Sequence, residues 1–202
     1  MNERVVLVPG LWMPAVAMAF LGAALARGGF RPVLFSYDGR GRFDRNADRL
    51  ATFARGEAFH FIGHSLGGVL ILEALSRHGE LPAASSVFIG SPVRGCEAGR
   101  RFGEWRLGRW MMGACAPLWA ERTSLWPRPA PLGVIAGTFP LGLGRVVTRL
   151  AQANDGVVQV SETTVEGMRE RVLVPLGHSR LIFSRRVAVL AARFLKQGTF
   201  EE

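Results

Sequence analysis

The chain has 202 residues, of which 49% are hydrophobic, so it is long and apolar enough for one domain with a full core. It carries 25 basic and 16 acidic residues, a net charge of +9, and every basic residue except Lys196 is an arginine. Such a surplus can attract nucleic acid, an anionic membrane surface or an acidic protein. The arginines are scattered, without a basic run, so we expect a solvated arginine-rich surface and no nucleic-acid partner.

Two cysteines, Cys96 and Cys115, are too few for a disulfide framework and lack the spacing of a metal site. We therefore expect small free thiols, buried or half-buried, in a reducing compartment. Neither a metal nor an organic cofactor is expected.

The first long apolar stretch, residues 5–26, contains no charged residue. Its length and composition also fit a secretory signal or a membrane span. Pro9, Pro14 and Gly22 interrupt it, however, and its removal would take the first strand from the sheet. We therefore expect a cytoplasmic protein, with export as the alternative. The predicted elements are a strand at 5–8, a loop at 9–12 and a helix at 14–27 that ends at Gly28-Gly29.

Farther along, short apolar runs alternate with segments of helical periodicity. This alternation predicts βαβ units, and the short connections favour a parallel sheet. Strands are predicted at 5–8, 32–37, 58–62, 85–90, 131–137 and 171–175, and the later helices at 43–55, 65–77 and 185–196. Ser184 and Gly198 are suited to begin and end the last helix. The fold class is therefore α/β: residues 1–202 form one domain with a mostly parallel sheet of about six strands, flanked by helices.

The apolar run at 58–62 ends in a tight turn around Ser65, and a helical segment follows at once. In a strand–turn–helix of this kind the serine is held in a strained conformation with its hydroxyl clear of the backbone. Gly63 and Gly67 fit, since a Cβ there would crowd the strand or the helix. With 25 glycines in the chain, the bare pattern also arises by chance as an ordinary turn. The string Gly63-His64-Ser65-Leu66-Gly67-Gly68 resembles the nucleophile elbow of lipases and esterases of the α/β-hydrolase family.

That resemblance implies an oxyanion hole made of two backbone N–H groups. One comes from the residue after the nucleophile, Leu66, and the other from the early loop, Leu11. The family pattern usually has histidine where this chain has Pro9, a departure that leaves the backbone role intact. Trp12 and Met13 then either flank a pocket for the acyl chain or pack as ordinary hydrophobic residues.

Between residues 92 and 131 the strand–helix pattern lapses, and four of the five tryptophans are found there. Seven arginines accompany only three acidic residues in this segment. One interpretation is a small cap or lid whose apolar face lines the substrate groove or touches lipid. The other is an insertion folded onto the sheet edge, with the indoles packed and the guanidinium groups in water. The four tryptophans are Trp105, Trp110, Trp119 and Trp126.

A serine hydroxyl needs a base, and the base needs an acidic partner. Of four histidines, only His178 lies in a loop after a strand, at the edge where such loops converge. Asp155 is the only aspartate after the elbow, in the turn Asn154-Asp155-Gly156. It is the candidate acid, with an Asx turn that bonds its own backbone as the alternative. The segments around Asp155 and His178 also resemble the acid and base loops of small bacterial lipase-like hydrolases.

These residues predict a serine hydrolase that cleaves carboxylic esters through an acyl-enzyme on Ser65, of lipase or carboxylesterase type. Its substrate is then a small-molecule or lipid acyl ester, and an anionic membrane surface is a candidate partner. The first alternative is a thioesterase or a hydrolase of acyl-carrier-protein esters, for which the basic surface would attract an acidic carrier. The second is a non-catalytic binding protein of the same fold.

Overall fold

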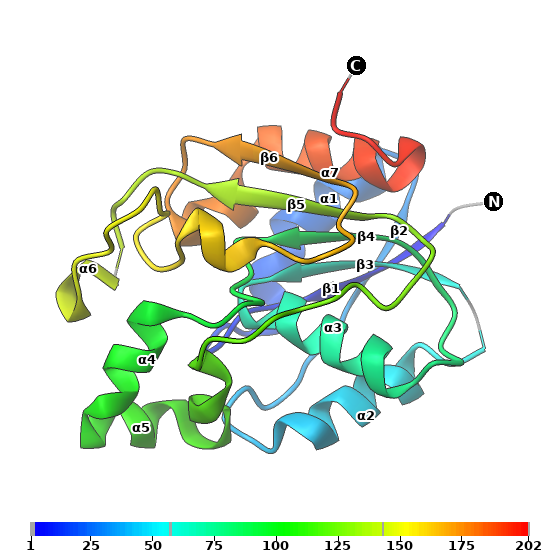
Figure 1. Cartoon of the computed structure of the whole chain (residues 1–202). Helices are drawn as coiled ribbons and strands as arrows, with labels where there is room; N and C mark the ends of the chain where they lie inside the picture. Colours follow the sequence, from blue (N-terminus) through cyan, green and yellow to red (C-terminus); the bar gives the residue numbers. More distant parts are fainter. Residues whose placement is uncertain (1–2, 57, 143, 202) are drawn as a thin grey trace.

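The computed structural model describes residues 3–56, 58–142 and 144–201 and builds them around one sheet of parallel strands. The strand order is β2-β1-β3-β4-β5-β6 (Figure 1). The chain runs outward from β1 to β2 and then crosses to the other side of β1, so the order reverses between β1 and β3, where open α/β sheets bind ligands. The strands are β1 (Arg4–Val8), β2 (Arg31–Leu34), β3 (Phe59–His64), β4 (Ala83–Ile89), β5 (Leu132–Gly137) and β6 (Glu170–Val174).

Two layers of helices cover the sheet, as the alternation of side chains along each strand requires. Val5 and Leu7 of β1 pack toward α1 (Ala19–Arg27) and α7 (Arg185–Gln197). Val6 and Val8 pack toward α2 (Phe43–Phe53) and α3 (Leu66–Arg77), on the opposite face (Figure 1). Every residue of β3 and β5 is buried, because both faces of these inner strands are covered.

The uncharged stretch at 5–26 folds into the domain rather than into a continuous helix. It comprises β1, a loop, a single 3₁₀ turn (Ala15–Met18) and α1, so the predicted helix at 14–27 begins with a tighter turn. Among residues 3–56, 58–142 and 144–201, no helix has both the length and the hydrophobicity to span a bilayer.

The predicted strand at 32–37 is too long, because β2 ends at Leu34. Phe35 still donates its N–H to Leu7 O (3.0 Å), but the chain then leaves the sheet edge. The hydroxyl of Tyr37 donates a hydrogen bond to Pro9 O (2.9 Å). Tyr37 therefore supports the loop after β1 instead of continuing β2.

The segment at 92–131 contains α4 (Glu97–Glu104), α5 (Arg106–Met112) and a 3₁₀ stretch (Gly113–Trp119). Its four tryptophans divide into two groups. Trp119 and Trp126 are buried in the core beside α3, whereas Trp105 and Trp110 are 50% and 66% exposed. The helices project at the edge of the sheet toward which the strands point (Figure 1).

The last third of the chain closes the domain. A short α6 (Gly144–Val147) and two 3₁₀ turns (Val160–Thr163 and His178–Phe183) precede α7. The predicted ends of α7 are confirmed: Ser184 Oγ accepts the N–H of Val187 (3.4 Å), and Gly198 ends the helix at φ +73°. Cys96 and Cys115 are free and buried, as expected.

We expect Phe194→Ala to destabilise the fold by about 3–5 kcal/mol, because it removes a fully buried ring from the core between α7 and the sheet. The Phe194 ring packs against Phe200, with 4.7 Å between ring centroids, and against Gly133, where it occupies the space that a Cβ would need. Val189→Ala, on the same helix but 58% exposed, is the control and should change stability by less than about 0.5 kcal/mol. Urea unfolding measures both; equal losses would contradict this account of the core.

Candidate functional site

Ser65 occupies the turn between β3 and α3 in a conformation that only a few non-glycine residues adopt. Its backbone has φ +52° and ψ −124°, and its N–H donates to Ile89 O (3.0 Å). The two glycines behave as predicted. A Cβ on Gly67 would lie 2.1 Å from Val8 O, and one on Gly63 would lie 2.4 Å from the backbone of α3. The turn is therefore forced by close packing of β1, β3 and α3.

Asp155 and His178 are hydrogen-bonded to each other, with 2.7 Å between Asp155 Oδ2 and His178 Nδ1. Both are buried: Asp155 is 1% exposed and His178 is 9% exposed. A second bond, from His178 N–H to Asp155 O (2.9 Å), joins their backbones. Because the carboxylate accepts, Nδ1 carries the proton, and a neutral His178 keeps its lone pair on Nε2.

The other carboxylate oxygen of Asp155 serves the turn itself. Oδ1 accepts the N–H groups of Val157 (3.0 Å) and Val158 (2.7 Å). The two interpretations of this aspartate from the sequence are thus compatible, because each uses a different oxygen. The Asx turn fixes the carboxylate that bonds to His178.

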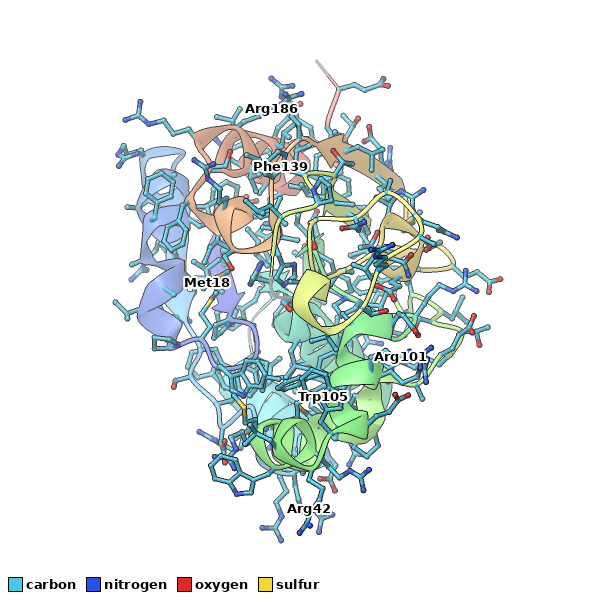
Figure 2. The ribbon with its side chains drawn as sticks, turned by 90° about the vertical axis from the view of Figure 1, so that its left-hand side faces the viewer. Met18, Arg42, Arg101, Trp105, Phe139 and Arg186 are labelled. Carbon is cyan, nitrogen blue, oxygen red and sulfur yellow. The ribbon has the colours of Figure 1, made fainter. Side chains whose placement is uncertain are left out.

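The segments that follow β1, β3, β4, β5 and β6 meet at the carboxyl edge of the sheet. This edge faces the viewer in Figure 2. A Cβ on Gly90, after β4, would lie 3.1 Å from Asp155 Oδ2 and 3.3 Å from His178 Nδ1. One on Gly10, after β1, would lie 3.0 Å from Ser65 Cβ. Glycine at these two places therefore lets the backbone approach the site closely.

Ser65 is partly exposed, and within the described part of the chain its hydroxyl makes no hydrogen bond, including to His178. The structure thus joins Asp155 to His178 directly and places Ser65 at the same edge, connected to His178 through the neighbouring residue His64. Catalytic hydrogen bonds in unliganded enzymes are often long and tighten when substrate binds.

His64 is the residue that the sequence reasoning left out. Its Nε2 lies 3.1 Å from His178 O; because a carbonyl oxygen can only accept, Nε2 carries the proton and donates the hydrogen bond. The centroids of the His64 and His178 rings are 4.8 Å apart. The side chain is fully buried, and Nδ1 finds no partner among the described residues. Burial, reinforced by the nearness of His178, lowers the pKa of His64 to about 3, so the ring is neutral at pH 7. Its position next to Ser65 was the available signal.

The two predicted oxyanion donors have no acceptor within residues 3–56, 58–142 and 144–201. Leu66 is the first residue of α3, where N–H groups lack an intrahelical partner. Leu11 lies in the loop after β1. Leu66 is fully buried and Leu11 is partly buried, and both follow strands at this edge of the sheet.

Trp12 and Met13, the predicted pocket residues, turn in different directions. The indole N–H of Trp12 donates to Met111 O (2.9 Å), and its ring meets Phe102 edge-on, with centroids 5.9 Å apart. Met13 packs against the layer of α1 and α7 instead. Trp12 also has a positive φ, +59°, so the loop that carries Leu11 is held in a strained form against α5.

The remaining histidines lie outside this site. His60, at the start of β3, contacts Glu3 (3.4 Å), and His78, at the end of α3, is hydrogen-bonded to Asp48 (2.9 Å). In the part of the chain that the structure describes, no three side chains of His, Cys, Asp or Glu are grouped so that they could hold a metal ion.

Comparison with known proteins agrees with this architecture. Solved structures with a similar fold include a Bacillus licheniformis lipase, BlEst2, in its mature form, with a TM-score of 0.75, 15% identity, and coverage of 98% of this chain and 92% of the lipase. A pyrethroid hydrolase from Sphingobium faniae has a TM-score of 0.65 and 13% identity, with 98% of each chain covered. The thioesterase RedJ from Streptomyces coelicolor has a TM-score of 0.60 and 16% identity, over 94% of this chain and 84% of RedJ. No curated protein matches the sequence.

At these identities the solved structures bear on the fold alone. The family model described as "Alpha/beta hydrolase family" matches residues 5–193, nearly the whole chain, and the six parallel strands with helices on both faces agree with it. The protein therefore belongs to the alpha/beta hydrolase family.

Proposed function

We propose that the protein is a serine hydrolase that cleaves carboxylic esters, with Ser65 as nucleophile, His178 as base and Asp155 as acid. The observation that carries the proposal is the buried 2.7 Å bond between Asp155 and His178 at the edge where the strained Ser65 turn ends β3. An oriented imidazole and a serine hydroxyl at one edge of the sheet are the groups that acyl transfer requires, which supports the proposal. The lipase and hydrolase neighbours are consistent with it.

In this mechanism Ser65 Oγ attacks the ester carbonyl carbon while His178 Nε2 takes the hydroxyl proton. Asp155 stabilises the imidazolium through Nδ1 without taking that proton. The tetrahedral intermediate collapses, and His178 gives the proton to the departing alcohol. Water then attacks the acyl-enzyme, losing a proton to His178, and the carboxylic acid leaves as Ser65 recovers its proton.

The N–H groups of Leu11 and Leu66 are the proposed donors to the oxyanion. Both lack an acceptor in the described residues, and Leu66 adds the positive end of the α3 dipole. A preorganised donor of this kind contributes about 10²–10³ in turnover.

His64 is proposed as a positioning residue for the base. Its N–H holds the backbone carbonyl of His178, so it fixes the loop from which the imidazole projects. Its neutrality matters, because a second positive ring 4.8 Å from His178 would oppose formation of the imidazolium.

Replacement of the nucleophile tests the central assignment. Ser65→Ala should lower kcat on p-nitrophenyl esters by several orders of magnitude and abolish labelling by a fluorophosphonate probe. Ser91→Ala, at a serine buried behind the elbow that donates to Gly63 O, is the control and should remain labelled. Turnover by Ser65→Ala at the parent rate would refute the mechanism.

Asp155→Asn should lower kcat by about 10³–10⁴, because an amide at Oδ2 no longer fixes the proton on Nδ1 of His178. The variant can keep Oδ1 as acceptor for Val157 and Val158, so the turn and the fold should persist. Circular dichroism checks the fold, and ester hydrolysis measures the loss. A folded Asp155→Asn enzyme with full activity would show that the acid lies elsewhere.

Removal of the His64 donor should lower kcat without a matching change in KM. His64→Leu should lose about tenfold in kcat, the effect of one hydrogen bond of roughly 1.4 kcal/mol, whereas His64→Gln, which keeps an N–H near Nε2, should recover most of it. His60→Gln, at a histidine in the same strand but at its other end, is the control. Equal activity of the leucine and glutamine variants would leave His64 without a positioning role.

The same residue predicts a pH dependence of stability. Folding lowers the pKa of His64 to about 3, so below the unfolded value of about 6.5 the unfolded chain binds more protons. The stability that the folded protein gains from keeping His64 neutral is therefore fully present above pH 6.5 and is lost as the pH falls toward 3. The melting temperature of the native protein should therefore fall more between pH 7 and pH 4 than that of His64→Gln. Parallel pH curves for the two proteins would contradict the burial of a neutral ring.

The second candidate function is that of a thioesterase, which would use the same residues on an acyl thioester. Two observations support it: the similar fold of the thioesterase RedJ and the net charge of +9, which would attract an acidic carrier. A panel of p-nitrophenyl esters and acyl thioesters of graded chain length, each run beside Ser65→Ala, separates the two. Ester turnover that exceeds thioester turnover at every chain length supports the esterase.

A further inference from the structure

Helix α5 exposes an apolar surface that is interleaved with positive charge. Trp105, Leu107 and Trp110 are 50%, 63% and 66% exposed. Arg106 and Arg109, on the same helix, are also exposed, and Arg40 adds a third guanidinium over the ring of Trp110, 4.9 Å from its centroid. We call this surface the α5 face; it comprises Arg40, Trp105, Arg106, Leu107, Arg109 and Trp110.

Packing and hydrogen bonds on the inner side of α5 fix the position of the α5 face and of its exposed rings. Gly108 is buried so closely that a Cβ there would lie 1.9 Å from Phe102 O. Phe102 also contacts the ring of Trp105, with centroids 6.0 Å apart. Arg40 donates to Trp110 O (2.9 Å) and accepts the N–H of Ala114 on its own carbonyl (2.8 Å).

The charge of the α5 face is not neutralised within the described residues. Arg40, Arg106 and Arg109 have no ion pair with a carboxylate there. The acidic residues of α4, Glu97 and Glu104, are paired with the two arginines of that helix, Arg100 and Arg101. Asp38, two residues before Arg40, accepts the backbone N–H of Arg40 (3.0 Å) but forms no ion pair with its guanidinium among the described residues. The face therefore presents three unpaired positive charges around three large apolar side chains.

The α5 face borders the proposed site. In Figure 2, which looks onto the carboxyl edge, Trp105 lies on the near face of the molecule. The indole of Trp12 is hydrogen-bonded to Met111 of α5, and Trp12 directly follows Leu11, a proposed oxyanion donor. A surface that covered the α5 face would thus lie beside the loop that carries Leu11.

We propose that the α5 face docks on an anionic lipid bilayer. Tryptophan side chains prefer the headgroup region, leucine enters the acyl boundary, and unpaired arginines meet the negative lipid charge. An acidic acyl carrier would match the arginines alone and would leave three large apolar side chains without a complement. The further step, that the ester comes from the bilayer, rests on the proposed function; the docking does not.

The experiment measures vesicle binding with the Ser65→Ala protein, so that binding is observed apart from hydrolysis. The probes are phosphatidylcholine vesicles with and without 30% phosphatidylglycerol, in co-sedimentation at low and at high salt. We expect binding to the anionic vesicles only, weaker at high salt. Leu107→Ser with Trp110→Ser should lower the affinity at least tenfold, and each of Arg106→Gln and Arg109→Gln about fivefold.

Matched controls lie on two other elements of the fold, β6 and α7. Val189→Ser with Leu173→Ser changes two side chains that are 58% and 49% exposed, and Arg185→Gln with Arg186→Gln changes two exposed arginines of α7. These proteins should bind like the parent. The proposal is overturned if no vesicle binds, if the α5 variants bind like the parent, or if an acyl-loaded acidic carrier protein binds this face while vesicles do not.

Hydrolysis then separates the two proposals. In the protein with an intact Ser65, Leu107→Ser with Trp110→Ser should hydrolyse a short water-soluble p-nitrophenyl ester at the parent rate but act less on an ester embedded in anionic vesicles. Loss of vesicle binding with the soluble activity intact supports the docking surface. If the parent protein binds vesicles through the α5 face but hydrolyses no ester, the proposed function is refuted and the docking surface stands.

Discussion

The hydrogen bond between Asp155 and His178 is the constraint on which the proposed chemistry depends, and the fold supplies it from two loops. Asp155 follows β5 and His178 follows β6, so neither residue is fixed by its own strand. The carboxylate is oriented by the N–H groups that bind Oδ1, and the imidazole is oriented by Oδ2. The bond from His178 N–H to Asp155 O and the bond from the His64 side chain to His178 O then join the loops. A buried polar network of this kind is stable because nearly every member is bonded.

The backbone reaches this network so closely because glycine follows β1 and β4 and stands near the start of α3. Side chains at Gly10, Gly67 and Gly90 would intrude on Ser65, on the backbone of β1 and on Asp155 respectively. The strained serine and the buried pair are therefore properties of the packed strand ends and not of the loops alone. This is the physical reason why a short pattern of glycines around one serine carries information about a whole site.

The sequence was informative wherever a local rule determined the structure. Apolar runs predicted the strands, and the cap residues Ser184 and Gly198 predicted both ends of α7. Asp155 and His178 could be paired because His178 is the one histidine in a loop that follows a strand and Asp155 is the only aspartate after the elbow. The extent of β2 could not be read, since it depends on a bond from Tyr37 to Pro9 across the site. Likewise, adjacency marks His64 as a neighbour of Ser65 but cannot say that its ring meets a carbonyl 114 residues away.

The unusual backbone of Trp12 has a mechanical consequence. Its indole is anchored to the carbonyl of Met111, while its main chain is twisted into the left-handed region one residue beyond Leu11. Glycine adopts a positive φ freely, whereas in a tryptophan it stores backbone strain that the surrounding contacts must offset. The Trp12 side chain therefore joins α5 to the loop in which Gly10 packs against Ser65, so a displacement of α5 would be transmitted to the backbone beside the proposed nucleophile.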